Sequence, residues 1–340
     1  MKKLLSVIVP AYKVEKYIQE CLESLLVPDS LHPKYEVYVI NDGTPDSSAE
    51  IARTFQTRYP SVFKVIDKEN GGHGSVWNMG LSMCEGKYVL FLDSDDHVEN
   101  LDRLISFLDT SDADLVMTDK VVFIDGTTSS KTIKIAGVAP GKVYSLDQEA
   151  WSYRGNGIFN AHFQSCVYKT DVLRRFGPLF IEKSYYDDII LFVAPLIGGT
   201  TYTYTDFALY HYREGRAGQT MDSAVIRKNM KMQLRQREYA VFFAGDYLPQ
   251  ISGPRKALVE GVVRRICKTL CDYIYKLPSS EEIPMLEEWI SFVKENVSSW
   301  KKVPEISLYG EMPFALYRLA IKTKNACVRF FQKIAHNQCI

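Results

Sequence analysis

The sequence predicts an α/β fold in which a mostly parallel sheet is flanked by helices and followed by a C-terminal helical region. In the first third of the 340 residues, short apolar runs alternate with segments whose apolar residues recur on one helical face. Such runs are typical of strands buried on both faces, and β-α alternation is typical of parallel sheets. From about residue 222 onward, helical spacing continues without strand-like runs.

Each element in the first third has its own local signal. Residues 5–9 form an apolar run that Pro10 ends, which indicates a buried strand. Thr44 and Pro45 read as an N-cap followed by proline at the first helical position, so a helix is expected to begin there. The expected strands cover residues 5–9, 36–40, 63–66 and 87–92, and the expected helices cover residues 14–26, 45–55, 75–84 and 98–108.

Later segments are more mixed. Between residues 111 and 212, strands are expected at 115–124 and 201–213, and helices at 168–176 and 187–196. Proline and glycine then separate four expected helices. These helices cover residues 223–245, 255–275, 281–300 and 314–336.

Composition excludes several classes of protein. The formal net charge is zero, which argues against a basic nucleic-acid-binding protein and an acidic disordered tail. The charge is divided unevenly, however: residues 1–212 carry 20 basic and 28 acidic side chains, and residues 213–340 carry 21 and 13. Seven dispersed cysteines without a CxxC pair indicate reduced thiols in a cytoplasmic protein. No apolar run is long enough to predict a transmembrane helix.

Three acids directly follow the apolar strand that ends at Leu92. Asp93, Asp95 and Asp96 would repel one another unless a cation neutralised them. Carboxylate oxygens suit Mg²⁺ or Mn²⁺, with substrate phosphates filling the remaining positions. The alternative is a solvated acidic turn that caps the next helix.

Two further polar segments also follow expected strands. Asp42 comes after strand 36–40 and is placed to accept a hydrogen bond from a base N–H, or it forms an ordinary Asx turn. Residues 70–75 contain three glycines before a helix, which permits close approach to a ligand phosphate or simply a flexible connection. His73 is expected to be a loop histidine rather than a metal ligand.

The last two segments lie in the second half. Asp187 and Asp188 begin an expected helix, where they provide a general base or simply complement the helix dipole. Residues 211–220 combine arginines and glycines after a strand. That composition suits the binding of a diphosphate, although a plain polar turn is the alternative.

Taken in order, these segments resemble the family 2 glycosyltransferases. The resemblance rests on residues 6–12, 39–46, 69–72 and 86–96, and it covers about residues 4–220. Members of the family have the GT-A fold, a Rossmann-like sheet, and transfer a sugar with inversion from a nucleotide sugar that is usually UDP-linked. The resemblance implies a catalytic domain over residues 1–220, with a nucleotide-sugar-binding half at 1–110 and an acceptor half at 111–220, and a helical region at 221–340.

The resemblance also implies individual roles. Asp188 best matches the catalytic base and Asp187 is the neighbouring candidate, while Asp42 matches the acid that reads the uracil. One departure is clear: the family's usual Ala-Arg-Asn is Val76-Trp77-Asn78 here, so a common donor contact is missing. The implied nucleotide-sugar-binding residues are Pro10, Ala11, Tyr12, Asp42, Asn70, Gly71, Asn78, Asp93, Ser94, Asp95, Arg216, Gly218 and Gln219. The implied ligands of Mn²⁺ or Mg²⁺ are Asp93, Asp95 and Asp96, and the suggested acceptor residues are Trp151 and His162.

The activity that follows from the resemblance is metal-dependent hexosyl or N-acetylhexosaminyl transfer in bacterial surface polysaccharide or glycoconjugate synthesis. The acceptor would be a saccharide or a lipid-linked molecule, and no nucleic acid is expected as a partner. A nucleotidyltransferase is the alternative enzyme, but residues 10–14 lack the glycine-rich basic loop it would need. An inactive nucleotide-sugar-binding module is the non-enzymatic alternative, and the presence of both Asp95 and Asp188 argues against it.

The C-terminal segment allows more than one role. An apolar stripe and basic side chains share residues 314–333, which fits peripheral contact with the inner face of a membrane. Packing of this segment on the catalytic domain, or a homodimer contact, is the alternative.

Overall fold

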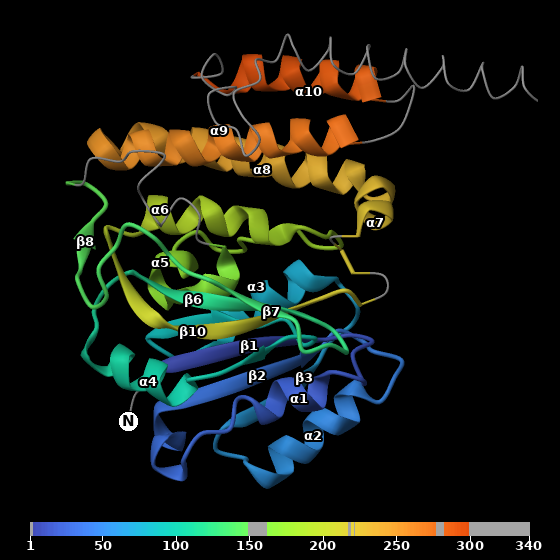
Figure 1. The fold of residues 1–340 in the computed structure, drawn as a ribbon, viewed down its shortest axis with the longest axis vertical. Coiled ribbons are helices and arrows are strands. Elements are labelled where there is room, and N and C mark those ends of the chain that lie inside the picture. The colour runs from blue at the N-terminus through green and yellow to red at the C-terminus, as the bar shows by residue number, and fades with distance from the viewer. Residues whose placement is uncertain (1–2, 149–161, 217–218, 221, 277–281, 299–340) are drawn as a thin grey trace, which may run out of the picture.

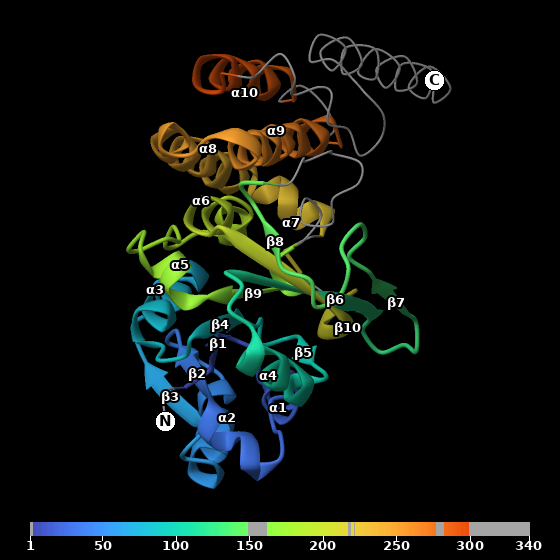
Figure 2. The same cartoon turned by 90° about the vertical axis from the view of Figure 1, so that its left-hand side faces the viewer.

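A curled sheet with helices on both sides forms the body of the molecule, and further helices lie against one side of it (Figures 1 and 2). The computed structural model describes residues 3–148, 162–216, 219–220, 222–276 and 282–298. Within these residues, ten strands form a single sheet. The α/β class predicted from the sequence is confirmed.

The first half of the sheet is parallel. Its strand order is β3-β2-β1-β4, with Leu5 in register with both Tyr35 and Tyr88. All seven residues of the central strand β1 are buried, which explains why six of them are apolar; the exception, Ser6, donates a hydrogen bond to Glu36. The strands are β1 (Leu5–Ala11), β2 (Tyr35–Asn41), β3 (Phe63–Asp67) and β4 (Tyr88–Phe91), and the helices are α1 (Ile18–Glu23), α2 (Ser48–Arg58), α3 (His73–Met83) and α4 (Leu101–Thr110), with a 3-10 turn η1 (Asp29–Lys34).

Two helices begin later than the sequence predicts. Thr44 does not cap α2: its hydroxyl donates to Asp46 and accepts a hydrogen bond from the backbone N–H of Lys13. Ser48, the first residue of α2, likewise accepts from the backbone N–H of Val14. The loops after β1 and β2 are therefore tied to each other, and these contacts replace the first turn of each predicted helix.

The second half contains a reversed strand that the sequence does not reveal. The expected helix over residues 168–176 is instead a strand, β9 (Cys166–Lys169), followed by the short helix α5 (Thr170–Arg174). β9 lies between β4 and β6 and is antiparallel to both. It thereby joins the two halves of the sheet. The other strands are β5 (His97–Val98), β6 (Leu115–Ile124), β7 (Ser130–Ile133), β8 (Tyr144–Ser145) and β10 (Thr201–Glu214).

The expected helix over residues 187–196 is divided. A 3-10 turn, η4 (Asp187–Phe192), is followed by α6 (Ala194–Gly198), which has proline in its first turn. A proline cannot donate the backbone hydrogen bond that a continuous helix would need. Another 3-10 turn, η3 (Phe163–Ser165), precedes β9.

Helices dominate the remaining described residues, as the sequence predicts. α8 and α9 pack against η4 and α6, and α10 lies on the far side of α9 (Figure 1). No described helix is long and apolar enough to cross a membrane. The predicted basic helix at residues 314–336 lies outside the described residues. The elements are α7 (Ser223–Lys228), α8 (Met230–Tyr247), η5 (Leu248–Gln250), α9 (Gly253–Lys276) and α10 (Glu282–Asn296).

Candidate active site

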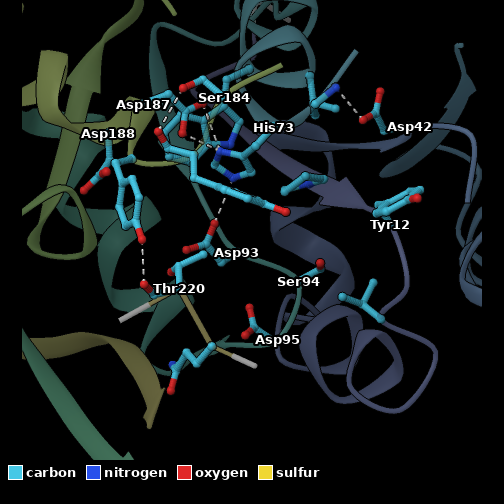
Figure 3. Close-up of a pocket in the computed structure, with 18 of the residues that line it drawn as sticks. Tyr12, Asp42, His73, Asp93, Ser94, Asp95, Ser184, Asp187, Asp188 and Thr220 are labelled. Carbon is cyan, nitrogen blue, oxygen red and sulfur yellow. Dashed lines mark hydrogen bonds and ion pairs between the residues drawn. The ribbon is translucent and has the colours of Figure 1, made fainter. Parts of the chain in front are cut away.

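A cavity of about 540 Å³ lies at the carboxyl ends of β1, β2 and β4. This is the edge at which ligands of such sheets bind. Figure 3 shows that side chains from both halves of the sheet point into it. The lining residues from the predicted site are Pro10, Tyr12, Asp42, Asn70, Asp93, Ser94, Asp95, Asp187, Asp188, Arg216 and Gln219.

Asp93 and Asp95 present two carboxylates to the cavity from the turn after β4 (Figure 3). The Asp93 carboxylate lies 3.1 Å from Nε2 of His73, and Asp95 pairs with the guanidinium of Arg216. Burial, together with the neighbouring charge of Asp93, raises the pKa of Asp95. Each acid is thus balanced by a cation or a hydrogen-bond donor of this chain.

Asp96 differs from the predicted metal ligand. It is 2% exposed and does not line the cavity. Its carboxylate accepts hydrogen bonds from the hydroxyl of Tyr210 at 2.8 Å and from the backbone N–H of Arg213 at 2.7 Å. Burial and the charges of Asp95 and Asp93 raise its pKa well above the usual range. The side chain therefore fastens the acidic turn to β10 and points away from the cavity.

Arg213 holds the same turn from the other side. Its Nε donates to the backbone carbonyl of Asp95 at 2.7 Å, and the two ends of its guanidinium pair with Glu20 and Asp125. The guanidinium also stacks over the rings of Tyr17 and Phe123. Arg213 therefore fixes the backbone of the acidic turn, a role that its position in an Arg- and Gly-rich segment does not reveal.

Asp42 organises the glycine-rich loop. Its carboxylate pairs with Lys68 at 2.6 Å and accepts hydrogen bonds from the backbone N–H groups of Gly71 and Gly72 at 2.9 and 2.8 Å. Gly72 has φ of +81°, and the backbone of Lys183 lies 3.1 Å from where its Cβ would be. The loop is therefore folded around Asp42, and Gly71 contributes through its backbone without lining the cavity.

His73 is the functional candidate that the sequence reading missed. It is the first residue of α3 and not part of a loop. Its Nδ1 lies 3.0 Å from Asp187, and its Nε2 lies 3.1 Å from Asp93. Burial opposes its protonation, but Asp187 and Asp93 outweigh burial and raise the pKa of His73 well above the usual range. An imidazolium therefore joins two acids that are 94 positions apart in the numbering of the chain.

Glycine at position 74 allows this bridge to form. A Cβ there would stand 2.3 Å from the carbonyl oxygen of Ile181 and 2.9 Å from a carboxylate oxygen of Asp187. Real Cβ atoms do not make contacts this short, so only glycine at position 74 lets α3 approach the segment before η4. The glycines at residues 70–75 were therefore a signal, visible in the sequence, that this segment approaches another part of the structure closely.

Asp188 is set apart from its neighbour. Both acids line the cavity, but Asp187 is buried and contacts His73, whereas Asp188 has no hydrogen-bond or ion-pair partner among the described residues. Burial, with the charges of Asp187 and Asp93, raises the pKa of Asp188 to about 7. A carboxyl group with this pKa is suited to accept a proton near neutral pH.

The segment after β10 closes one side of the cavity. Gln219 donates to the backbone carbonyl of Arg213 and accepts from the backbone N–H of Gly215. The hydroxyl of Tyr186 donates to the backbone carbonyl of Thr220 at 2.9 Å (Figure 3). This segment is therefore tied both to β10 and to the residue that precedes Asp187. Gly218 lies outside the described residues.

Three other predicted residues do not line the cavity. The carboxamide of Asn78 bonds to the backbone of Leu179 and Phe180 through three hydrogen bonds of 2.8–2.9 Å. Ala11 is fully buried in β1, and the ring of His162 packs against Phe192. Phe163 and Gln164, which follow His162, do line the cavity. Trp151, the other suggested acceptor residue, lies outside the described residues.

Trp77 explains the departure from the usual Ala-Arg-Asn sequence. Its ring is fully buried, and its centroid lies 4.7 Å from that of Phe91 and 5.1 Å from that of Phe180. Where the family pattern places an arginine, this chain therefore has a hydrophobic anchor that packs α3 onto β4 and onto the segment before η4.

Comparison with known proteins agrees with this geometry. Residues 6–177 match the model of the family Glycosyl transferase family 2. The poly(ribitol-phosphate) beta-N-acetylglucosaminyltransferase TarS of Staphylococcus aureus is 28% identical over 229 residues, which are 65% of this chain and 37% of that protein. The chain thus spans little more than a third of this relative's length.

Two solved structures share the fold. The crystal structure of S. aureus TarS 1–349 in complex with UDP aligns with a TM-score of 0.64 and 18% identity, covering 97% of this chain and 91% of that one. The mannosyltransferase PcManGT of Pyrobaculum calidifontis, in complex with GDP-Man and Mn²⁺, aligns with a TM-score of 0.50 and 13% identity, covering 96% and 88%. The sheet order and the matched half of the sequence agree: the chain has the GT-A fold and belongs to glycosyl transferase family 2.

Proposed function

We propose that this chain transfers a sugar, with inversion, from a UDP-sugar to a hydroxyl group of a bacterial surface polysaccharide or glycoconjugate. The proposal rests mainly on the position of Asp188, because an unpaired carboxyl group with a pKa of about 7 lies in the same cavity as Asp93 and Asp95. The family membership supports the reaction class. The cavity supplies the two features that a single displacement requires, namely a base and a place for the departing diphosphate.

Asp93 and Asp95 fit a divalent cation. They supply hard oxygen ligands at the end of a buried strand, and burial, followed by the charge of Asp93, raises the pKa of Asp95, as expected for a carboxylate that a cation would stabilise. We assign Mn²⁺ or Mg²⁺ to these two residues; in PcManGT, a protein of the same fold, Mn²⁺ accompanies GDP-Man. When bound, such a cation offsets the negative charge that develops on a leaving diphosphate. Asp96 is omitted from the proposed ligands because its carboxylate is already bonded to Tyr210 and Arg213.

Asp188 acts as the general base in this proposal. It accepts the proton of the acceptor hydroxyl as that oxygen attacks the anomeric carbon, and the nucleoside diphosphate departs from the opposite face. One displacement inverts the anomeric configuration and needs no covalent nucleophile. Asp187 serves as a positioning residue, because its carboxylate is buried against His73.

Asp42 and Tyr12 are suited to hold the nucleotide base. The Asp42 carboxylate offers about four acceptor positions, and Lys68 and the two glycine N–H groups use three of them. One position therefore remains for a base N–H. Tyr12 lines the same end of the cavity and is 41% exposed, so its ring provides a face on which a base stacks.

Arg216 is placed to exchange partners when the donor binds. In the free protein its guanidinium neutralises Asp95. A cation bound by Asp93 and Asp95 would displace it, and an arginine released beside a diphosphate is suited to bind that diphosphate. Gln219 holds the arginine's segment against β10.

The class of acceptor and the compartment follow from the relatives and the cysteines. TarS is named as a poly(ribitol-phosphate) glycosyltransferase, and another relative, GgaB of Bacillus subtilis, is named as a minor teichoic acid biosynthesis protein. Surface polymers are therefore the proposed acceptor class. The five cysteines among the described residues are buried and form no disulfide with one another, which supports a reducing compartment such as the cytoplasm.

A donor screen tests the proposal. Thermal unfolding of the full chain would be followed with UDP-, GDP- and dTDP-linked sugars, each with and without Mn²⁺ or Mg²⁺, and slow hydrolysis of the donor would be measured in parallel. We expect a UDP-sugar to raise the unfolding temperature in a metal-dependent manner and to be hydrolysed. Stabilisation by no nucleotide would overturn the proposal.

A further inference from the structure

A second cluster of possible metal ligands lies where β5 pairs with β10. His97 and His211 are directly opposite each other in this antiparallel pair, and Glu99 follows β5. One ligand atom from each of the three side chains lies within 4.8 Å of the other two. None of these three residues lines the cavity that holds Asp188.

The spacing of the cluster suits a small four-coordinate cation. Nε2 of His211 lies 3.4 Å from a carboxylate oxygen of Glu99, and Nδ1 of His97 lies 3.5 Å from a carboxylate oxygen of Glu20. The ligand atoms of a tetrahedral zinc site are about 3.3–3.6 Å apart, as bonds of about 2.0–2.2 Å require. Glu20 pairs with Arg213 and is not one of the three clustered residues, so a bound water would supply the fourth ligand.

The two imidazoles have unused ligand atoms. Nδ1 of His97 and Nε2 of His211 are shielded from solvent, and neither makes a hydrogen bond within the described part of the chain. Buried polar atoms of this kind cost free energy unless a partner satisfies them.

The rings are held in place without a metal. Their centroids are 4.7 Å apart with planes inclined at 31°, and Phe123 packs against His97 at 5.1 Å. A metal site organised in this way loses little side-chain entropy when the ion binds. Two imidazole nitrogens with carboxylate oxygens favour Zn²⁺ over Mg²⁺, which prefers oxygen ligands alone.

We propose that His97, His211 and Glu99 form a zinc-binding site, separate from the aspartate pair in the cavity, that links β5 to β10. His97 directly follows the acidic turn, and His211 lies two positions before Arg213, which holds that turn through the carbonyl of Asp95. A bound ion would therefore fasten together the two strands that support the turn. This inference does not depend on the proposed function, because it concerns residues outside the cavity.

Zinc retention by the full, tag-free chain tests the site. The protein would be incubated with Zn²⁺ in the presence of excess Mg²⁺, passed through gel filtration, and analysed for zinc by mass spectrometry. His211→Asn and Glu99→Gln would each remove one ligand, and His32→Asn would remove a histidine elsewhere in the chain. Asp95→Asn would show whether zinc binds at the aspartate pair instead.

We expect about one retained zinc per wild-type chain, the same for the His32 and Asp95 variants, and about a tenfold or greater loss of retained zinc for His211→Asn and Glu99→Gln. Glu99 is largely exposed, so its variant gives the answer even where a histidine variant fails to fold. Wild-type protein that retains no zinc, or a Glu99 variant that retains as much as wild type, would overturn the proposal. Loss of zinc only in the Asp95 variant would do the same.

Discussion

Nδ1 of His73 lies 3.0 Å from the carboxylate of Asp187, so the first residues of α3 and η4 meet across the cavity. The opposite nitrogen of the same ring lies 3.1 Å from Asp93. One protonated imidazole therefore connects the acid that we assign to the metal with the residue next to the proposed base. This contact couples the donor side of the cavity to the acceptor side.

Replacing His73 with alanine is expected to shift the pH dependence of transfer. The charge of His73 lowers the pKa of Asp188, so removing this charge raises the pKa of Asp188. As the pH is lowered, protonation of the base should therefore begin to decrease kcat/KM at a higher pH than in the wild type. We also expect kcat/KM at pH 7 to decrease by about 10–100-fold, as for other partners that orient a reacting group. The measurement is a pH profile of kcat/KM. His73→Gln, which can still form hydrogen bonds, is the control for geometry; an unchanged midpoint in His73→Ala would contradict this role.

Replacing Asp188 with asparagine removes the proposed base while keeping the size of the side chain. Transfer is expected to decrease by about 10²–10⁴-fold, the usual contribution of a general base. Affinity for the nucleotide, measured by calorimetry, should stay within about twofold. Asp206→Asn, on an exposed acid of β10, is the matched control. Transfer by Asp188→Asn at the wild-type rate would exclude Asp188 as the base.

The same variant is expected to change how stability depends on pH. The pKa of Asp188 is about 7 in the folded protein and about 3.9 in an unfolded chain, so the folded state binds the proton more tightly. Its contribution to stability is therefore present at low pH and is lost as the pH rises from about 4 to 7. Over that range Asp188→Asn should gain up to about 4 kcal/mol relative to wild type. Urea unfolding at several pH values measures this, and a difference independent of pH would contradict the raised pKa.

Arg216 and the metal are expected to compete for Asp95. Arg216→Ala frees the Asp95 carboxylate, so the free protein should bind Mn²⁺ about tenfold more tightly, the equivalent of about 1.4 kcal/mol. Transfer should nevertheless decrease, because the diphosphate loses a cationic partner. Titration followed by the paramagnetic resonance of free Mn²⁺ gives the affinity, and Arg216→Lys is the control that keeps the charge. Weaker Mn²⁺ binding in Arg216→Ala would show that the pair does not compete with the metal.

Asn78 is expected to stabilise the fold without contributing to donor binding. Asn78→Ala leaves three backbone groups of Leu179 and Phe180 without their partner, so the free energy of unfolding should decrease by about 2–4 kcal/mol. Nucleotide affinity should not change, since Asn78 does not line the cavity. Urea unfolding and calorimetry measure the two quantities. Asn296→Ala removes one exposed hydrogen bond within α10 and should have little effect; a large loss of nucleotide affinity in Asn78→Ala would restore the donor-binding assignment.

The parallel half of the sheet could be predicted because the residues within each of its strands and helices indicate that element's structure. β1, β2 and β4 are buried, largely apolar runs, and α4 has a clear apolar face, whereas β3 is a shorter and partly exposed strand. β9 could not be predicted in this way, because its four residues continue directly into α5 and share that helix's apolar spacing. Its strand conformation comes from pairing with β4 and β6, which are distant in sequence.

The site was predictable to the same extent. The acids after β2 and β4 could be found because they follow buried strands, and parallel strands bring their carboxyl ends to one edge. The Asp96 side chain points away from the cavity because it bonds to Tyr210 and Arg213, and only the folded sheet brings these two residues near it. The bridge from His73 to Asp93 and Asp187 depends likewise on three separate segments. Spacing along the chain carries no signal for such contacts.

The reversed strand β9 has a consequence for recombination between relatives. The residues assigned to the nucleotide base and the metal, from Tyr12 to Asp95, precede it, whereas Asp188 and Arg216 follow it, so the base and one diphosphate-binding side chain belong to the same later stretch of chain. Exchanging that stretch between homologous enzymes, with a junction in the short loop between α4 and β6, would bring in a new base together with its acceptor surroundings. Such a chimera should keep its donor preference, provided that the incoming segment still presents a carboxylate to His73.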